Sequence, residues 1–286
     1  MSHSVKKVRI QWQFNMVFNF CDIFLMWIDT HCHPYFEPYT GREGEIIGPA
    51  RGAGVTKMIA IGCDSKSNRQ ALALTENFDG VFAVLGVHPT ELHDFTDEEV
   101  AFLRAQAGRA RAQGSCAGGK IVAIGEIGLD YFHNKYSPAE QERVFRAQIV
   151  LARELDLPCV IHSRDSAEDT LRILLDEKVT RAVFHCYSYD LAFARRLWEK
   201  GYYTSFTGIV TYPNARAVQE VAAAAPEDMF FLETDCPFLP PQSKRGQVNQ
   251  MSYLIEIGEK VAELRGCSVS EIADLTTRNA ERWFGI

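Results

Sequence analysis

Two histidines one residue apart, His31 and His33, directly follow the short run Trp27–Thr30. Side chains at positions i and i+2 share a face of an extended chain, so both imidazoles would point the same way at the end of a strand. Imidazole is a common metal ligand, and two aligned imidazoles supply half of a metal site. Because a lone His-x-His also occurs by chance on protein surfaces, the interpretation depends on ligands elsewhere in the chain.

Later apolar runs end in the same kinds of residue. Five of the eight histidines follow or end such runs, and carboxylates join them in the fourth and eighth runs: His31, His33, His88, Glu126, His162, His185, Glu233 and Asp235. Glu126 lies between two glycines in an apolar run, where a carboxylate without a partner would be costly to bury. Asp235 and Glu233 would share a face, and we prefer Asp235 as a ligand because it is nearer the strand end.

Structural alternatives exist for each residue taken singly. His162 and His185 are compatible with buried core histidines, Asp235 with a helix cap, and His88, which precedes a proline, with a loop residue. Equivalent positions in consecutive runs are explained more simply by a shared site. We therefore predict six metal ligands at one end of the fold: His31, His33, Glu126, His162, His185 and Asp235.

Six ligands exceed the three protein ligands that a catalytic zinc ion takes, so two divalent metal ions are expected. Glu126 would bridge them, His31, His33 and Asp235 would complete one site, and His162 and His185 the other. Such a pair lowers the pKa of a water molecule and clamps both oxygens of a displacement, which favours hydrolysis of an ester or amide. Asp235 is the candidate general base and Glu126 the second candidate catalytic residue. The ligand types fit Mg²⁺, Mn²⁺ or Zn²⁺.

The elements that must position these residues follow one repeated pattern, an apolar run, a polar or glycine-rich turn and a helical stretch. The eight runs are Met26–Asp29, Thr56–Gly62, Val81–His88, Ile121–Asp130, Pro158–Ser163, Ala182–Tyr187, Tyr202–Thr207 and Met229–Asp235. Nearly continuous apolar strands are typical of a parallel sheet covered by helices, and eight such units predict a single-domain α/β fold, the (β/α)8 TIM barrel. Ser137–Glu140 reads as a capping box that starts one of the helices.

Composition excludes some classes of protein. The chain has 286 residues, a net charge of −7 and eight cysteines without a CxxC pair. This charge argues against a protein that coats nucleic acid through a basic face, but not against an enzyme whose metal ions supply positive charge. Scattered cysteines favour reduced thiols and a cytoplasmic location over a disulfide framework.

Residues 1–25 differ from the rest. Their apolar part, from Ile10 to Leu25, is interrupted by Asn15, Asn19 and Asp22, and is too short and polar to cross a membrane. We expect a poorly ordered N-terminal extension before a hydrolase domain at 26–286, with Met26 as the real or ancestral start.

From Met26 onward the chain resembles the TatD family of metal-dependent deoxyribonucleases in the amidohydrolase superfamily. The resemblance rests on Ile28–His33, Gly86–Pro89, Gly125–Asp130, Val160–Arg164, Phe184–Cys186 and Leu232–Pro237. It implies a (β/α)8 barrel, a divalent metal pair held by the same six residues, and hydrolysis of phosphodiester bonds in DNA, often from the 3′ end. The expected partner is single-stranded or damaged DNA, with no obligate protein partner and no membrane.

Substrate contacts are expected from His88, Arg164, Lys244 and Arg245. Arg164 would neutralise a phosphate, and the Lys244-Arg245 pair would reach the nucleic-acid backbone. The family's usual Asn-Glu-Pro reads Asn249-Gln250-Met251 here, which bears on substrate choice rather than on the metal ligands. Two other functions remain open: a metal-dependent hydrolase of another ester or amide, such as an aminoacyl-RNA or a cyclic amide, and a non-catalytic binding barrel.

Overall fold

Eight parallel strands pair in sequence order in the computed structural model, which describes residues 25–112 and 120–286. The strands are β1 Trp27–Cys32, β2 Val55–Ile61, β3 Val81–Leu85, β4 Ile121–Asp130, β5 Cys159–Arg164, β6 Ala182–Phe184, β7 Tyr203–Phe206 and β8 Phe230–Leu232. Residues 1–24, which make up nearly all of the expected extension, lie outside the described residues, so the extension stays a prediction.

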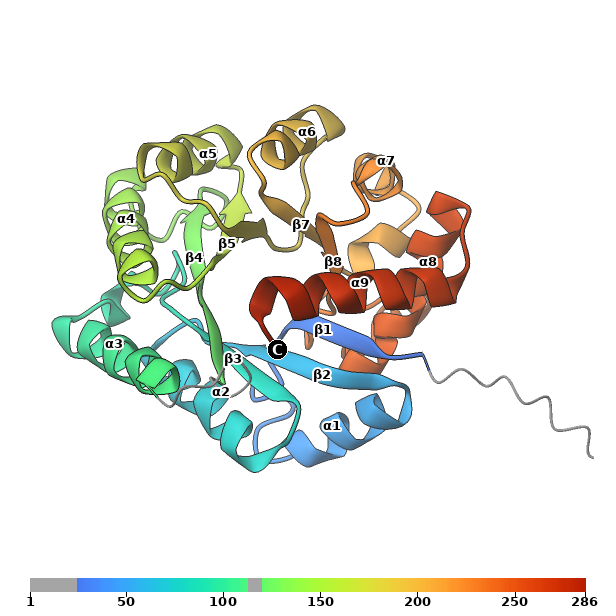
Figure 1. Cartoon of the computed structure of the whole chain (residues 1–286), viewed down its shortest axis with the longest axis horizontal. Coiled ribbons are helices and arrows are strands. Elements are labelled where there is room, and N and C mark those ends of the chain that lie inside the picture. Colours follow the sequence, from blue (N-terminus) through green and yellow to red (C-terminus); the bar gives the residue numbers. More distant parts are fainter. Residues whose placement is uncertain (1–24, 113–119) are drawn as a thin grey trace, which may run out of the picture.

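The first and last strands meet at their carboxyl ends. The backbone N–H of His33 donates to the carbonyl oxygen of Cys236, and that of Asp235 donates to the carbonyl oxygen of His31, both at 2.8 Å. The Thr30 hydroxyl donates to the carbonyl oxygen of Leu232 at 3.2 Å. These bonds bring β1 against the end of β8 and confirm the predicted (β/α)8 barrel (Figure 1).

Helices follow the strands and surround the sheet (Figure 1). They are α1 Glu43–Gly52, α2 Ser65–Asn77, α3 Asp97–Ala112, α4 Pro138–Glu154, α5 Ala167–Asp176, α6 Leu191–Glu199, α7 Arg216–Ala224, α8 Leu254–Arg265 and α9 Val269–Phe284, with short 3₁₀ turns at Leu92–Asp94, Gly208–Thr211, Gln242–Lys244 and Met251–Tyr253. The predicted capping box is confirmed: the Glu140 amide donates to the Ser137 hydroxyl, and the Ser137 amide donates to the Glu140 carboxylate.

The core has two layers. The larger one lies between the strands and the surrounding helices. The smaller one joins buried residues of seven strands, among them Ile59, Val84 and Phe231, with Trp283 and Phe284 of α9. Side chains from strands on opposite sides of the barrel can share one cluster only if they point toward the barrel axis. In Figure 1, α9 crosses in front of the barrel, so its last turn covers one mouth and leaves the opposite mouth for the site.

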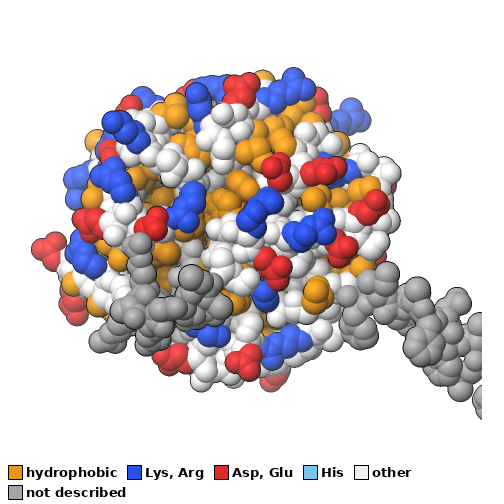
Figure 2. All heavy atoms as spheres, in the orientation of Figure 1, with side chains coloured by type: hydrophobic (Ala, Val, Ile, Leu, Met, Phe, Trp, Pro, Cys, Tyr) orange, Lys and Arg blue, Asp and Glu red, His pale blue; other side chains and the backbone are white. Residues whose placement is uncertain are grey.

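Charge is mixed on the face that carries α9. Figure 2 shows acidic and basic side chains intermingled over the described residues of this face. No helix among the described residues is long and apolar enough to cross a membrane. The six cysteines of the described ranges are free, which agrees with the prediction of reduced thiols.

Three strands end three residues before their predicted ends. The runs expected to end at His88, Tyr187 and Asp235 leave the sheet at Leu85, Phe184 and Leu232. Beyond these points some backbone amides still donate to a neighbouring strand, as Glu233 does to Phe206. Others donate to side chains: Val87 to Oε1 of Gln148, and Cys186 to Oε1 of Glu233, both at 2.7 Å. The apolar pattern extends past the sheet because these tails are buried over the mouth of the barrel.

Candidate metal centre

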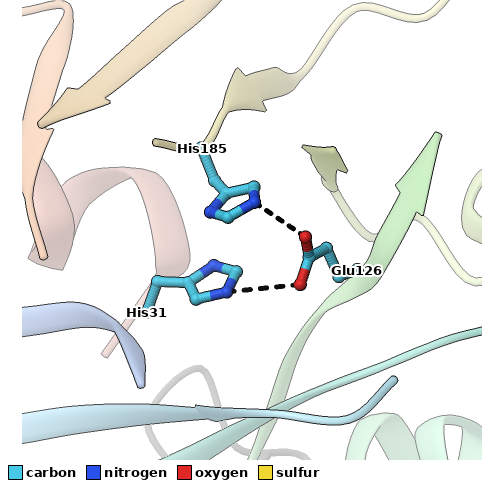
Figure 3. Close-up of side chains that lie close together, drawn as sticks. All are labelled: His31, Glu126 and His185. Atoms are coloured by element: carbon cyan, nitrogen blue, oxygen red, sulfur yellow. Dashed lines mark ion pairs between the residues drawn. The ribbon is translucent and has the colours of Figure 1, made fainter. Parts of the chain in front are cut away.

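Glu126 of β4 is the hub of a cluster of histidines. Its Oε1 atom lies 2.7 Å from Nε2 of His185, 2.8 Å from Nδ1 of His162 and 3.4 Å from Nε2 of His88, while its Oε2 atom lies 3.4 Å from Nε2 of His31. Figure 3 shows His31 and His185 approaching the carboxylate from two different strand ends. The two oxygens of one buried carboxylate therefore face different sets of imidazoles.

Asp235 completes the other side of the cluster. Its Oδ1 atom lies 3.4 Å from Nε2 of His33 and 3.6 Å from Nε2 of His31. The residue has a φ of 54°, in the left-handed region that aspartate tolerates better than most residues. Its backbone N–H donates to the carbonyl oxygen of His31, which ties the end of β8 to the end of β1. His31 thus lies between two carboxylates, those of Glu126 and Asp235.

Burial and charge act in opposite directions on the cluster. Burial disfavours an ionised Glu126, but the charges of His185 and His88 and the hydrogen bonds from His162 and His185 outweigh it and hold the pKa of Glu126 well below its usual range. Burial, together with the neighbouring charge of His185, lowers the pKa of His31. A carboxylate that stays ionised beside a neutral imidazole is the pairing of protonation states that metal coordination requires.

The residues fit a metal ion. His31 is fully buried, and neither of its ring nitrogens has a hydrogen-bond partner among the described residues. Buried polar atoms are rarely left without a partner, so an Nε2 atom that has no hydrogen bond and faces two carboxylates fits a metal ligand. Four sets of side chains bring their ligand atoms within 4.8 Å of one another: His31, Glu126 and His185; His31, His33 and Asp235; His33, Cys63 and Glu126; His88, Glu126 and His162. Imidazole and carboxylate together suit Zn²⁺ or Mn²⁺.

Further groups lie behind two of the imidazoles. Nδ1 of His33 lies 3.0 Å from the carbonyl oxygen of Ile61. Because a carbonyl only accepts, Nδ1 carries the proton, and the lone pair of Nε2 is available to a metal ion. Nδ1 of His185 lies 3.5 Å from Oε1 of Glu233, the carboxylate that also accepts the Cys186 amide. Glu233 therefore faces the back of His185, whereas Asp235 faces the cluster, in line with the preference for Asp235 as a ligand.

The cluster lies at the bottom of a pocket of about 980 Å³. His33, Glu126, His162, His185 and Asp235 line it, and His31 lies behind them with no exposed surface. Its volume is at the upper end of the range for small-molecule and cofactor sites.

Comparison with known proteins gives the family. The TatD related DNase family matches residues 28–285. This chain belongs to the TatD-related DNase family. YabD, a metal-dependent hydrolase of Bacillus subtilis (strain 168), is 38% identical over 263 residues, which cover 91% of this chain and all of the relative. The 3'-5' ssDNA/RNA exonuclease TatD of Cronobacter sakazakii is 35% identical over 248 residues, 84% of this chain and 90% of the relative.

A solved TatD-family structure confirms the fold. The crystal structure of the TatD homologue YjjV from Escherichia coli K12 superposes with a TM-score of 0.85 at 32% identity, covering 92% of this chain and all of YjjV. The family and the fold predicted from the sequence are therefore correct. The structure brings all six predicted ligands together, and their individual roles in this TatD-family member stay predictions.

The four predicted substrate residues differ in position. Arg164 lines the pocket, with its guanidinium 3.8 Å from the centre of the Phe132 ring. His88 also lines the pocket but contacts Glu126. Lys244 pairs with Glu256 at 3.3 Å, and Arg245 lies over the ring of Tyr212. Neither Lys244 nor Arg245 lines the pocket, so the structure does not bring them to the metal ligands.

Sequence reasoning missed several pocket residues. Asp130 lies 3.0 Å from Nε2 of His162 and 2.8 Å from Nδ1 of His133, and His133 lines the pocket. Asp130 ends the Gly125–Asp130 motif but received no predicted role. Its position at the end of an apolar run could have marked it as a site residue. Phe36 and Phe238 also line the pocket, and only the fold shows that these distant residues are neighbours.

Proposed function

We propose that this chain is a divalent-metal-dependent nuclease that hydrolyses phosphodiester bonds in single-stranded DNA. The observation that carries the proposal is the placement of Glu126, whose two oxygens face two separate sets of imidazoles at the open mouth of the barrel. Active sites of such barrels lie at the carboxyl ends of the strands, where these residues are found. Membership of the TatD-related DNase family, and the name of the Cronobacter relative, support DNA as the substrate.

Two metal ions fit this division of ligands. Oε2 of Glu126, His31, His33 and Asp235 would hold one ion, and Oε1 of Glu126, His162 and His185 the other. When bound, the pair would activate water and offset the negative charge that develops on the phosphate. The carboxylate of Asp235 lines the pocket, so it would accept the proton that the activated water releases.

Arg164 is placed to hold the substrate rather than to react. Arg164 lines the pocket, and none of the ion pairs among the described residues involves its guanidinium. A guanidinium without a protein anion can bind a phosphate through two parallel hydrogen bonds. This residue would hold a phosphate next to the bond that is cleaved.

The test is cleavage of labelled single-stranded DNA by the purified protein with Mg²⁺ or Mn²⁺, with and without chelator. We expect a ladder of shortened products that chelator abolishes and that Glu126→Ala reduces by far more than ten-fold. Circular dichroism and the metal content of Glu126→Ala separate loss of ligand from loss of fold. Intact DNA together with cleavage of a panel of esters and amides would favour a different substrate. Near-wild-type turnover by Glu126→Ala would show that the ligand assignment is wrong.

A further inference from the structure

Two phenylalanine rings border the metal ligands on one side of the pocket. Phe36 stacks on the imidazole of His33 with ring centres 4.9 Å apart and planes 9° apart. Phe238 meets the Phe36 ring edge-on at 6.2 Å and lies 6.1 Å from the His33 ring. We call Phe36 and Phe238 the aromatic shelf. Both rings of the aromatic shelf lie next to the imidazole of His33, one of the predicted metal ligands.

Phe238 is exposed although its backbone is fixed. Its side chain is 51% exposed, whereas most large apolar residues of the described chain are buried. The buried amide of Asn249 donates to the carbonyl oxygens of Phe238 and Thr234, at 2.5 and 2.7 Å, and the Phe238 amide donates to the carbonyl oxygen of Asp235 at 3.0 Å. The exposure therefore does not arise from a loose loop, because the turn that presents the ring is held from both sides.

The position of the shelf restricts what can cover it. Phe238 follows Asp235 by three residues and shares the pocket with it, so a molecule that covers the ring also reaches the metal ligands. Arg164, the last residue of β5, lines the same pocket and offers a cation to a phosphate. An occupant that carries both a flat apolar face and phosphates matches both features. Nucleobases stack on aromatic side chains in this way without regard to sequence.

We propose that the aromatic shelf is a nucleobase-binding subsite that stacks the base of the nucleotide whose phosphodiester bond is cleaved. The inference rests on the proposed nuclease function and adds to it a binding role for Phe238, with Phe36 as its support. Stacking without hydrogen bonds to the base edge predicts cleavage of all four nucleotides. The shelf orients the substrate and takes no part in proton transfer.

The test combines a protein change with a substrate change. Wild type and Phe238→Ala are compared on a short oligothymidylate and on oligomers in which one nucleotide at a time is replaced by an abasic residue. For one position, we expect the abasic residue to lower the kcat/KM of the wild type about ten-fold, and Phe238→Ala to cause a similar loss on the complete oligomer. At that position the two losses should not add, because each removes the same contact.

Two controls complete the design. Phe238→Trp keeps an aromatic ring and should retain most of the wild-type kcat/KM, and Leu175→Ala removes an exposed apolar side chain on α5 and should change nothing. If Phe238→Ala lowered kcat/KM equally on complete and abasic oligomers, the base-binding role of the aromatic shelf would be wrong, while the proposed nuclease function would stand. Absence of DNA cleavage by the wild type would overturn the proposed function and this inference with it.

Discussion

At the scale of single residues, the chemistry rests on buried histidines and carboxylates, residue types that are rarely buried without a partner. Histidines and carboxylates at the ends of apolar runs must converge in a parallel barrel, and the structure places Nε2 of His31 3.4 Å from Glu126 and 3.6 Å from Asp235. The aromatic shelf was not predictable in this way. Phenylalanine is a core residue in most places, and only the fold shows that the ring of Phe238 is exposed beside the ligands.

Arg164 provides a prediction at this scale. Its guanidinium stacks on the Phe132 ring, and it forms no ion pair with any described residue. Arg164→Ala should raise KM for single-stranded DNA about ten-fold with a smaller change in kcat, because a phosphate contact outside the reacting bond contributes mainly to binding. Steady-state kinetics at two salt concentrations check this. Arg143→Ala, an exposed cation on α4 away from the pocket, should leave KM unchanged. A selective fall in kcat would place Arg164 in the reaction itself.

At the scale of elements, the type and order of the strands were predictable but some of their ends were not. Apolar runs report burial, and burial continues past the last strand pair wherever a tail covers the barrel mouth. The tail after β6 is held by the bond from Cys186 to Glu233, which involves residues far apart in the sequence. Ends of this kind depend on tertiary contacts, so local periodicity cannot locate them.

Helices α4 and α5 are joined by a network of ion pairs that also escaped prediction. Arg146 contacts Glu142, Asp176 and Glu177 at 2.8 to 3.0 Å, and Arg172 contacts Glu142 at 2.9 Å. Hydrogen bonds from Arg172, and further ones from Arg146, lower the pKa of Glu142 even though burial acts against it. Because the side chains are partly exposed, solvent screens the network and its contribution is modest.

Arg146→Met should therefore lower the free energy of unfolding by about 1 kcal/mol at pH 7. A carboxylate whose pKa is depressed in the folded state stabilises it above the unfolded pKa, near 4.5 for Glu142, and loses that contribution as pH falls through the folded value. The difference between variant and wild type should shrink below pH 4.5 and at high salt. Urea unfolding at several pH values measures it, with Lys260→Met, which removes one exposed pair with Glu263, as the control. A difference independent of pH would assign the loss to packing.

At the scale of the whole molecule, the barrel separates stability from chemistry. One mouth is covered by α9, whose Trp283 and Phe284 pack on residues that face the barrel axis, and the other holds the ligand cluster. Eight strand and helix units in one chain predict this division, since active sites of such barrels lie at the carboxyl ends of the strands. The sequence did not show which helix covers the first mouth, because that depends on how α9 packs across the sheet (Figure 1).

Metal binding at the open mouth should stabilise the whole molecule. An ion that binds only the folded state at one hundred times its Kd adds about 2.7 kcal/mol, which corresponds to a rise in Tm of roughly 5 °C for a chain of this size. We expect Mn²⁺ or Zn²⁺ to raise the Tm of chelator-treated protein by this amount, as followed by circular dichroism. Glu126→Gln should reduce the rise, because it removes the charge shared by both sets of imidazoles. An identical rise in the variant would mean that the metal binds elsewhere.

At the mouth that α9 covers, a substitution should change stability but not the rate of catalysis. Trp283 is 9% exposed and contacts Phe231 and Phe284, with ring centres 5.5 and 4.6 Å away. Trp283→Ala should lower the free energy of unfolding by about 3 kcal/mol, because it removes a large buried ring and leaves a cavity below the barrel. Below the reduced Tm, however, kcat should stay within about two-fold of wild type, because the ligands are held by the bonds between β1 and the end of β8. Chemical unfolding and DNA cleavage measured on the same preparation separate the two quantities. A large fall in kcat in fully folded Trp283→Ala would show that the closed mouth helps to position the metal ligands.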